Sequence, residues 1–388
     1  MTPSPRPPRN RRPSRRVGDP SEGRRSSSAV ADFGGGGGRA GGCGGGRSGG
    51  APRTVVVLGG ATAILAAAML VGTLVGPAGL TAQGVLLELV GRLPLIDVDS
   101  GLTDRQQVIL WELRIPRVVL GALVGAMLAI AGAAYQGVFR NPLADPYLLG
   151  VSSGAGLGAT MAFVLGGSLG AVGVPPAAFV GGMIAVLATY ALGRTVGGGR
   201  TEVVIILAGV AVGAFANALQ TFLMQRHDDS LRQVYSWMLG RLSTDGWSEV
   251  LRVLPYVVVA VAVIALHRRT LDVMAVGDVE ASSLGVSPAR VRLLLICVAT
   301  LGTAAVVSVS GLIGFVGIII PHAVRLVIGP GHRLLLPLSL LVGAAFLVLT
   351  DVVARTAMSP AELPIGVVTA TIGAPFFLLV LNRSRGHR

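Results

Sequence analysis

Arginine is the residue type with the clearest potential for chemistry in this sequence. The chain has 388 residues and 32 basic residues, and all 32 are Arg because the sequence contains no Lys. A P-loop requires a lysine that reaches the nucleotide phosphates, so the chain has no Walker A site of its own for ATP hydrolysis. Schiff-base chemistry is excluded for the same reason.

One pair of arginines has a spacing that predicts a site for anions. Arg114 and Arg117 form the motif R-I-P-R, and residues three apart lie on the same face of a helix. Guanidinium groups bind carboxylates through paired hydrogen bonds. Arg355 is expected at the same membrane surface. The alternative interpretation is that these arginines anchor their helices among lipid headgroups.

Other catalytic or metal-binding patterns are missing from the sequence. The five His are dispersed, and neither H-E-x-x-H nor G-x-S-x-G occurs. Cys43 and Cys297 lack the spacing of a metal or redox motif. Asp351 and Glu362 are expected at the outer ends of the last two apolar stretches, so no buried chain of ionisable groups predicts proton coupling. We therefore predict that the chain is not an enzyme, binds no metal or cofactor, and depends on another polypeptide for energy.

Composition places these residues in a membrane protein. Hydrophobic residues make up 52% of the chain, charged residues 13%, and the mean hydropathy is +0.71. A soluble domain carries about 25% charged residues. The shortage of charge leaves too little polar surface for a water-soluble globule.

Apolar stretches divide the chain into about ten predicted transmembrane helices, several of them short or interrupted by Gly and Pro. The stretches are Val55 to Val75 and residues 115–139, 148–168, 175–192, 203–224, 250–266, 293–310, 311–328, 334–350 and 363–381. We expect an all-α integral membrane protein. Interrupted spans indicate backbone that lines a cavity or packs inside protein, since lipid cannot satisfy it.

The ends of the chain differ from this central region. Residues 1–53 hold 11 Arg, three acids and long runs of Gly, Ser and Pro, which predicts a disordered cytoplasmic tail; a start codon further downstream is the alternative. Residues 54–382 form the predicted transmembrane domain, and 383–388 a basic C-terminus. Ten spans place both termini on the same side of the membrane, and the basic N-terminus predicts that this side is the cytoplasm. The excess of Arg in the loops of that side agrees.

Two further stretches carry distinctive motifs. The first is R-N-P-L-A-D-P at residues 140–146, followed by L-L-G-V-S-S-G-A. The second runs from Gly311 to Pro375 and contains G-F-V-G, P-H, E-L-P-I-G-V-V-T-A and G-A-P. With R-I-P-R, these motifs resemble, in order and spacing, the FecCD/BtuC-type permeases of type II ABC importers, which take up iron-siderophores, haem or vitamin B12. The resemblance covers about residues 54–382.

The resemblance implies partners and roles for particular residues. Two permease copies, expected as a homodimer although a paralogous heterodimer is an alternative, would enclose a pathway in the plasma membrane. Two ATPase subunits that use ATP would bind below, and an extracytoplasmic substrate-binding protein would dock on Arg114, Arg117 and Arg355. No partnership with nucleic acid is expected.

Three other groups of residues acquire expected roles in this way: the ATPase coupling loop, the cytoplasmic connector and the pathway lining. The plainer alternatives are a solvated loop for the first, a turn without contacts for the second and helix packing for the third. The residues are Asp278, Glu280, Leu284, Gly285, Val286, Ser287 and Pro288 (coupling loop, expected to form two short helices), Arg140, Asn141, Pro142, Asp145 and Pro146 (connector), and Gly209, Gly213, Asn217, Thr369, Thr371 and Gly373 (pathway lining).

The function expected from these observations is an ATP-driven importer permease for a metal chelate, with iron-siderophore as the first cargo because it is the commonest in the family. Vitamin B12 and haem are the alternatives within the family. An ion-coupled secondary transporter is a less favoured class, because the spans lack the ionisable residues that it needs.

Overall fold

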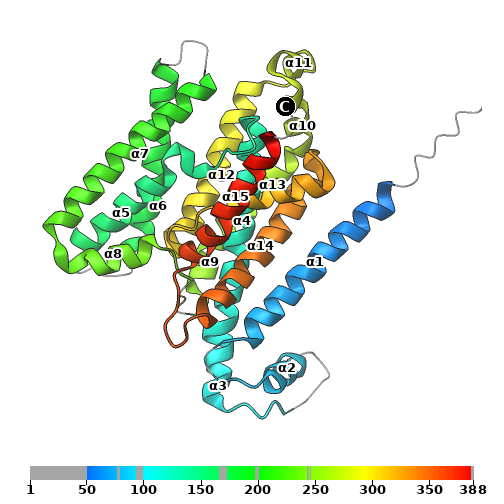
Figure 1. The fold of residues 1–388 in the computed structure, drawn as a ribbon, viewed down its shortest axis with the longest axis vertical. Coiled ribbons are helices and arrows are strands. Elements are labelled where there is room, and N and C mark those ends of the chain that lie inside the picture. The colour runs from blue at the N-terminus through cyan, green and yellow to red at the C-terminus, as the bar shows by residue number, and fades with distance from the viewer. Residues whose placement is uncertain are drawn as a thin grey trace, which may run out of the picture. The chain divides into compact units, whose positions relative to one another are not determined.

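The computed structural model describes residues 50–76, 79–92, 99–165, 173–196, 201–242, 244 and 246–385, all within one unit, Ser48–Arg388. These residues are mostly helical (Figure 1). The predicted tail lies outside the described residues except for residues 50–53, which begin the first helix. The long helices are α1 (Gly50–Leu74), α4 (Ile115–Val138), α5 (Val151–Leu165), α6 (Val174–Val196), α7 (Thr201–Arg226), α9 (Ser248–Leu266), α12 (Pro288–Ser310), α13 (Val316–Ile328), α14 (His332–Thr356) and α15 (Ile365–Arg385).

Short elements connect the long helices. They are α2 (Ala82–Gly91), α3 (Asp104–Val108), a π-helical turn (Ile109–Arg114), a 3-10 turn (Pro146–Leu149), a second 3-10 turn (Asp228–Ser230), α8 (Leu231–Met238), α10 (Arg268–Val276) and α11 (Asp278–Ser283). Local sequence explains several boundaries. Thr103 and Gln106 form a capping box at the start of α3. Pro288 occupies the first position of α12, where its missing amide hydrogen costs nothing.

Seven segments of the described chain are long and apolar enough to cross a membrane. They contain α1, α4, α6, α7, α9, α12 and α14. The other three predicted spans coincide with α5, α13 and α15, whose apolar helical stretches are shorter. In the predicted span 311–328, the helix begins only at Val316. Residues 311–315 are not helical, and both Gly311 and Phe315 have a positive φ, +69° and +70°. The described chain is helical, as predicted, and its apolar spans agree with a membrane protein; the number of crossings and the side of the termini stay predictions.

Helix α4 is the centre of the described unit. In its most apolar window 83% of the residues are buried, against 17% for α1, which packs on α14 at the periphery. Helix α4 contacts α9, α12, α13 and α14. Close approach requires glycine: a Cβ on Gly132 would overlap the carbonyl group of Gly317 in α13, and one on Gly125 would overlap Gly343 in α14.

Helices α5, α6 and α7 pack together beside this centre, and α12 contacts both α5 and α6 (Figure 1). Gly154 and Gly158 of α5 lie directly on the backbone of α6. The small residues of these stretches therefore serve helix packing.

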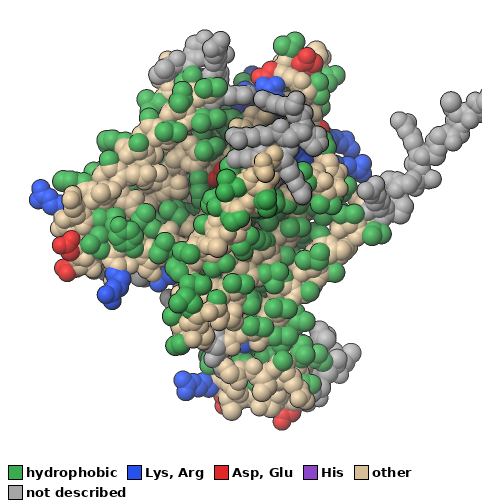
Figure 2. All heavy atoms as spheres, viewed as in Figure 1, with side chains coloured by type: hydrophobic (Ala, Val, Ile, Leu, Met, Phe, Trp, Pro, Cys, Tyr) green, Lys and Arg blue, Asp and Glu red, His purple; other side chains and the backbone are tan. Residues whose placement is uncertain are grey.

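Charged side chains gather at the top and bottom of the molecule and on its left flank, where α7 meets α8, and hydrophobic side chains cover much of the surface between them (Figure 2). Helices α2 and α3 lie at one end, while α10, α11 and the C-terminal end of α15 lie at the other (Figure 1). By the predicted orientation the first end is extracytoplasmic and the second cytoplasmic.

Candidate functional site

Five charged residues meet where the C-terminal ends of α1 and α14 lie beside the N-terminal end of α4, the end predicted to be extracytoplasmic. We call Arg114, Arg117, Asp351, Arg355 and Glu362 the arginine cluster. Arg114 ends the π-helical turn that precedes α4, Arg117 lies in the first turn of α4, and Asp351 and Arg355 are one turn apart in α14. A Cβ on Gly76 would contact the guanidinium groups of Arg114 and Arg355, so the absence of a side chain there leaves room for both.

Arg114 and Arg355 hold the C-terminal end of α1. Arg114 donates a hydrogen bond of 3.1 Å to the carbonyl oxygen of Thr73, and Arg355 donates two, each of 3.1 Å, to those of Gly72 and Val75. Carbonyl groups at a helix C-terminus lack intrahelical partners and carry partial negative charge, so cations are stabilised there. Both side chains are buried, with 5% and 3% exposed.

Arg117 binds two carboxylates. Its Nε and Nη2 atoms donate hydrogen bonds of 3.0 and 2.9 Å to Asp351 Oδ1. Its Nη1 and Nη2 atoms donate to the two oxygens of Glu362, at 3.0 and 2.9 Å. Asp351 is also 2.9 Å from Nε of Arg355. These ion pairs offset the desolvation cost of burying the carboxylate of Asp351.

The structure therefore brings together the three arginines predicted for docking, but turns them toward different partners. The docking role itself stays a prediction. Asp351 and Glu362 were predicted at this end of the membrane, but their pairing with the arginines was not. The spacing of Asp351 and Arg355, four residues apart in one helix, was a signal for that pairing.

The predicted coupling loop lies at the opposite end, the one predicted to be cytoplasmic (Figure 1). Helix α11 ends in a Schellman motif: the amide of Val286 donates to the carbonyl of Ala281, and that of Gly285 to the carbonyl of Ser282. Gly285 has φ +80°, as such a cap requires. Leu284 beside it is 70% exposed. Gly285 therefore caps α11, while contact of this loop with an ATPase stays a prediction.

One detail of the coupling loop was predicted wrongly. Ser287 and Pro288 begin the long helix α12 and not a second short helix, because the apolar sequence after Pro288 contains nothing that ends a helix before Ser310. The short helices here are α10 and α11.

Acidic residues tie this region to the bundle. Asp278 accepts two hydrogen bonds of 3.2 Å from Nη2 of Arg292 in α12 and lies 3.4 Å from Nη2 of Arg140. Asp272 of α10 accepts the amide hydrogen of His332 at 2.8 Å and lies 2.7 Å from its Nδ1. The start of α14 is thereby capped by a side chain from α10.

The predicted cytoplasmic connector divides into two halves. Arg140, Asn141 and Pro142 are partly or fully exposed, but the chain then turns inward, and Asp145 and Pro146 are buried. The carboxylate of Asp145 lies against Gly317 and accepts the amide hydrogen of Tyr147 at 2.8 Å. Tyr147 donates its hydroxyl hydrogen to the carbonyl of Ile313. The second half of the connector therefore packs inside the protein, and the predicted role as a cytoplasmic connector does not account for this burial.

Burial governs the charge of Asp145. It raises the pKa of this carboxyl group from 3.8 to about 6, although the hydrogen bond from Tyr147 acts in the opposite direction. A polar link lies nearby, in which Gln136 of α4 donates to the carbonyl of Gly317 and accepts from Arg325 of α13 at 2.9 Å.

The six predicted pathway residues fall into two groups. Gly209 packs on Leu148, Gly213 on Ser153 and Gly373 on the ring of Phe315, and Thr369 is fully buried. These contacts agree with the packing alternative. Asn217 and Thr371 are exposed. Thr371 lines a cavity of about 530 Å³ together with Met238, Leu239, Leu312, Gly314 and Phe315. A pathway role stays a prediction for all six.

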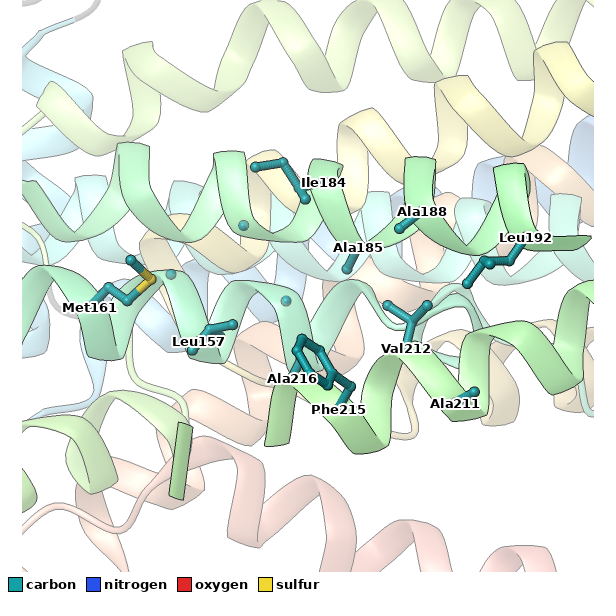
Figure 3. A pocket seen from close by; sticks show the side chains of 13 residues that line it. Leu157, Met161, Ile184, Ala185, Ala188, Leu192, Ala211, Val212, Phe215 and Ala216 are labelled. Atoms are coloured by element: carbon teal, nitrogen blue, oxygen red, sulfur yellow. The ribbon is translucent and has the colours of Figure 1, made fainter. Parts of the chain in front are cut away.

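A second cavity, of about 480 Å³, lies between α5, α6 and α7 (Figure 3). Leu157, Met161, Ile184 and Phe215 line it, with Ala and Gly residues between them. Its walls carry no charged side chain. Among the described residues, no group of three or more His, Cys, Asp or Glu side chains is placed to hold a metal ion.

Comparison with known proteins gives the chain a family context. The model of the FecCD transport family matches residues 63–383. A cobalamin import system permease protein, BtuC, of Halobacterium salinarum is 48% identical over 283 residues, covering 73% of this chain and 75% of the relative. The hemin transport system permease protein HmuU of Yersinia pestis is 40% identical, covering 71% and 84%.

Two further matches complete this context. The Fe(3+) dicitrate transport system permease protein FecD of Escherichia coli is 38% identical over 277 residues, covering 71% of this chain and 86% of the relative. A solved inward-facing structure, described as of metal-chelate type among ABC transporters, superposes with a TM-score of 0.73 at 30% identity. It covers 84% of this chain and 99% of the other.

Proposed function

The chain belongs to the FecCD transport family, and from that premise we propose that it is the permease subunit of an ATP-driven importer that moves a metal chelate across the plasma membrane. Its relatives are named as transport permeases and not as enzymes. The single observation that carries the proposal is the match to this family over residues 63–383, which includes every motif named above.

The energy for transport comes, in this proposal, from separate ATPase subunits. The absence of Lys removes a Walker A site from this chain. Helices α10 and α11, with Leu284 exposed at the tip, form the surface on which the ATPase acts. Asp278 and Asp272 carry its motion to α12 and α14 through Arg292 and His332. ATP is used by the partner, and this chain binds no cofactor.

A substrate-binding protein docks at the opposite end, on the arginine cluster, and a second copy of this chain completes the pathway as a homodimer. The exposed residues Asn217 and Thr371 are proposed to face that pathway. Small and weakly polar walls suit a bulky chelate, because they let it pass without holding it.

The identity of the chelate is the finer part of the proposal. Ferric siderophore is first by its frequency in the family. The higher identity with a cobalamin permease, 48% against 40% and 38% for the hemin and ferric dicitrate permeases, favours cobalamin as the second candidate to be tested beside it.

The test is ATP-dependent uptake in cells with and without the gene, with labelled ferric siderophore, haem and cobalamin offered in parallel. Deletion should abolish uptake of one cargo, and the wild-type gene should restore it. Unchanged uptake of all three, in cells without a redundant paralogue, would refute the metal-chelate proposal.

A further inference from the structure

The arginine cluster holds more positive charge than its own carboxylates neutralise. It contains three guanidinium groups and two carboxylates, and Asp351 is shared between Arg117 and Arg355. Arg114 binds the carbonyl oxygens of Thr73 and Leu74. Among the described residues of the cluster, one positive charge is therefore left without a matching carboxylate, which favours an anionic partner.

The two carboxylates differ in how firmly they are held. The side chain of Asp351 is 2% exposed and lies between Arg117 and Arg355. Moving it away would leave the buried guanidinium group of Arg355 without its carboxylate partner. The side chain of Glu362 is 45% exposed and contacts one arginine, Arg117, which is itself 18% exposed. An ion pair at such a surface contributes little net stability, because water and salt compete with it. Glu362 is therefore the carboxylate that can move away from Arg117 and be replaced there by a carboxylate of another molecule.

The backbone around Glu362 is fixed independently of its side chain. The amide of Leu363 donates to the carbonyl of Ala354 at 2.9 Å, and the amide of Ile365 to that of Gly240 at 3.1 Å. Exchange therefore needs only a rotation of the Glu362 side chain into solvent. Such a rotation exposes the outer edge of the Arg117 guanidinium group, which binds carboxylates through two parallel hydrogen bonds.

We propose that Glu362 is a built-in competitor: it occupies on Arg117 the position that a carboxylate of an acidic protein segment takes when that segment docks. The partner is an acidic surface of another protein, since the planar guanidinium group of Arg117 already binds a carboxylate through two parallel hydrogen bonds. The identification of that partner with the substrate-binding protein rests on the proposed function, whereas the exchange at Arg117 does not.

The experiment uses the full chain in nanodiscs of neutral phosphatidylcholine, with a fluorescent hexaglutamate peptide as the probe. Glu362→Gln keeps the size of the side chain but removes the competing charge, and should tighten peptide binding by about 3- to 10-fold. Asp229→Asn is the matched control, because Asp229 is exposed and lies outside the cluster. It changes net charge equally and should alter affinity less than twofold.

Three outcomes would overturn the exchange. Equal tightening by Glu362→Gln and Asp229→Asn would mean that only net charge matters. Tighter binding of inorganic phosphate than of hexaglutamate to Glu362→Gln would point to a lipid headgroup as the occupant. Arg117→Lys, which keeps the charge but loses the fork, should weaken the peptide at least fivefold, and unchanged binding would also refute the proposal.

A second readout does not depend on a ligand. Phenylglyoxal modifies accessible arginines, and mass spectrometry should show faster modification of Arg117 in Glu362→Gln than in wild type, with Arg114 and Arg355 unchanged. Equal rates at Arg117 would contradict exchange. The proposed function fails separately: a chain that imports none of the three chelates yet shows both effects would refute the importer and leave the competitor standing.

Discussion

Gly132 of α4 and Gly317 of α13 are in direct backbone contact, so that a Cβ on Gly132 would overlap the Gly317 carbonyl group. Gln136, one turn along α4, donates to the same carbonyl, and the carboxylate of Asp145 also lies against Gly317. The central helix, the interrupted span and the buried half of the connector therefore meet at one point.

Gly132→Ala should destabilise the protein strongly. The added methyl group meets backbone, which cannot rotate away, and overpacking of a close-packed core costs about 1–3 kcal/mol. The melting temperature in detergent should fall by several degrees. Gly59→Ala is the control, since Gly59 also lies in a long helix but has nothing within 4 Å of its added Cβ. Equal melting temperatures for both variants would contradict the packing described.

Much of the fold follows from the sequence because apolar length and charge act locally. The span at Val55 to Val75 and the Pro288 start of α12 depend on neighbouring residues alone. The inward turn of Asp145 and Pro146 depends on Gly317, which is more than 170 residues away, and no local pattern of the connector encodes it. Likewise, R-I-P-R identified the arginines, but their carbonyl partners come from the distant end of α1.

Asp145 should make stability depend on pH. Its pKa in the folded protein, about 6, lies above the ordinary value of 3.8, so the folded state binds more protons between these values. The contribution of Asp145 to stability is therefore greatest below pH 4, falls as the pH rises through 6, and then levels off; its full change is on the order of 3 kcal/mol.

Asp145→Asn separates this effect from other titrations. Asn keeps an oxygen that can accept the Tyr147 amide hydrogen but carries no charge. Melting temperatures measured from pH 4.5 to 7.5 should show a smaller decline for the variant than for wild type. Parallel curves would show that Asp145 does not titrate in this range.

Asp278→Ala should loosen the coupling loop without unfolding the bundle. It removes the partner of Arg292 and Arg140 at the start of α11, a partly exposed network that contributes about 1 kcal/mol. Amide hydrogen exchange over residues 277–287 should then accelerate roughly fivefold. Glu280→Ala removes an acid from the same helical turn, so similar acceleration in both variants would assign the effect to the helix dipole.

The exposed tip of the coupling loop gives the most direct test of energy transfer. Leu284 is 70% exposed beside Gly285, which ends α11 in a left-handed conformation. Val276 and Val279 in the same loop are 74% and 79% exposed, and the proposed function has the ATPase cover these apolar side chains. Leu284→Glu leaves the loop backbone intact but places a charge on that surface. ATP-dependent uptake should fall by at least tenfold, while protein abundance and binding of the acidic peptide at the arginine cluster stay normal. Gly285→Ala acts differently: its Cβ meets nothing within 4 Å, so its cost is the backbone strain of φ +80°, about 1–2 kcal/mol. Normal uptake by Leu284→Glu would remove the coupling role from this loop, even if the family and the arginine cluster retained theirs.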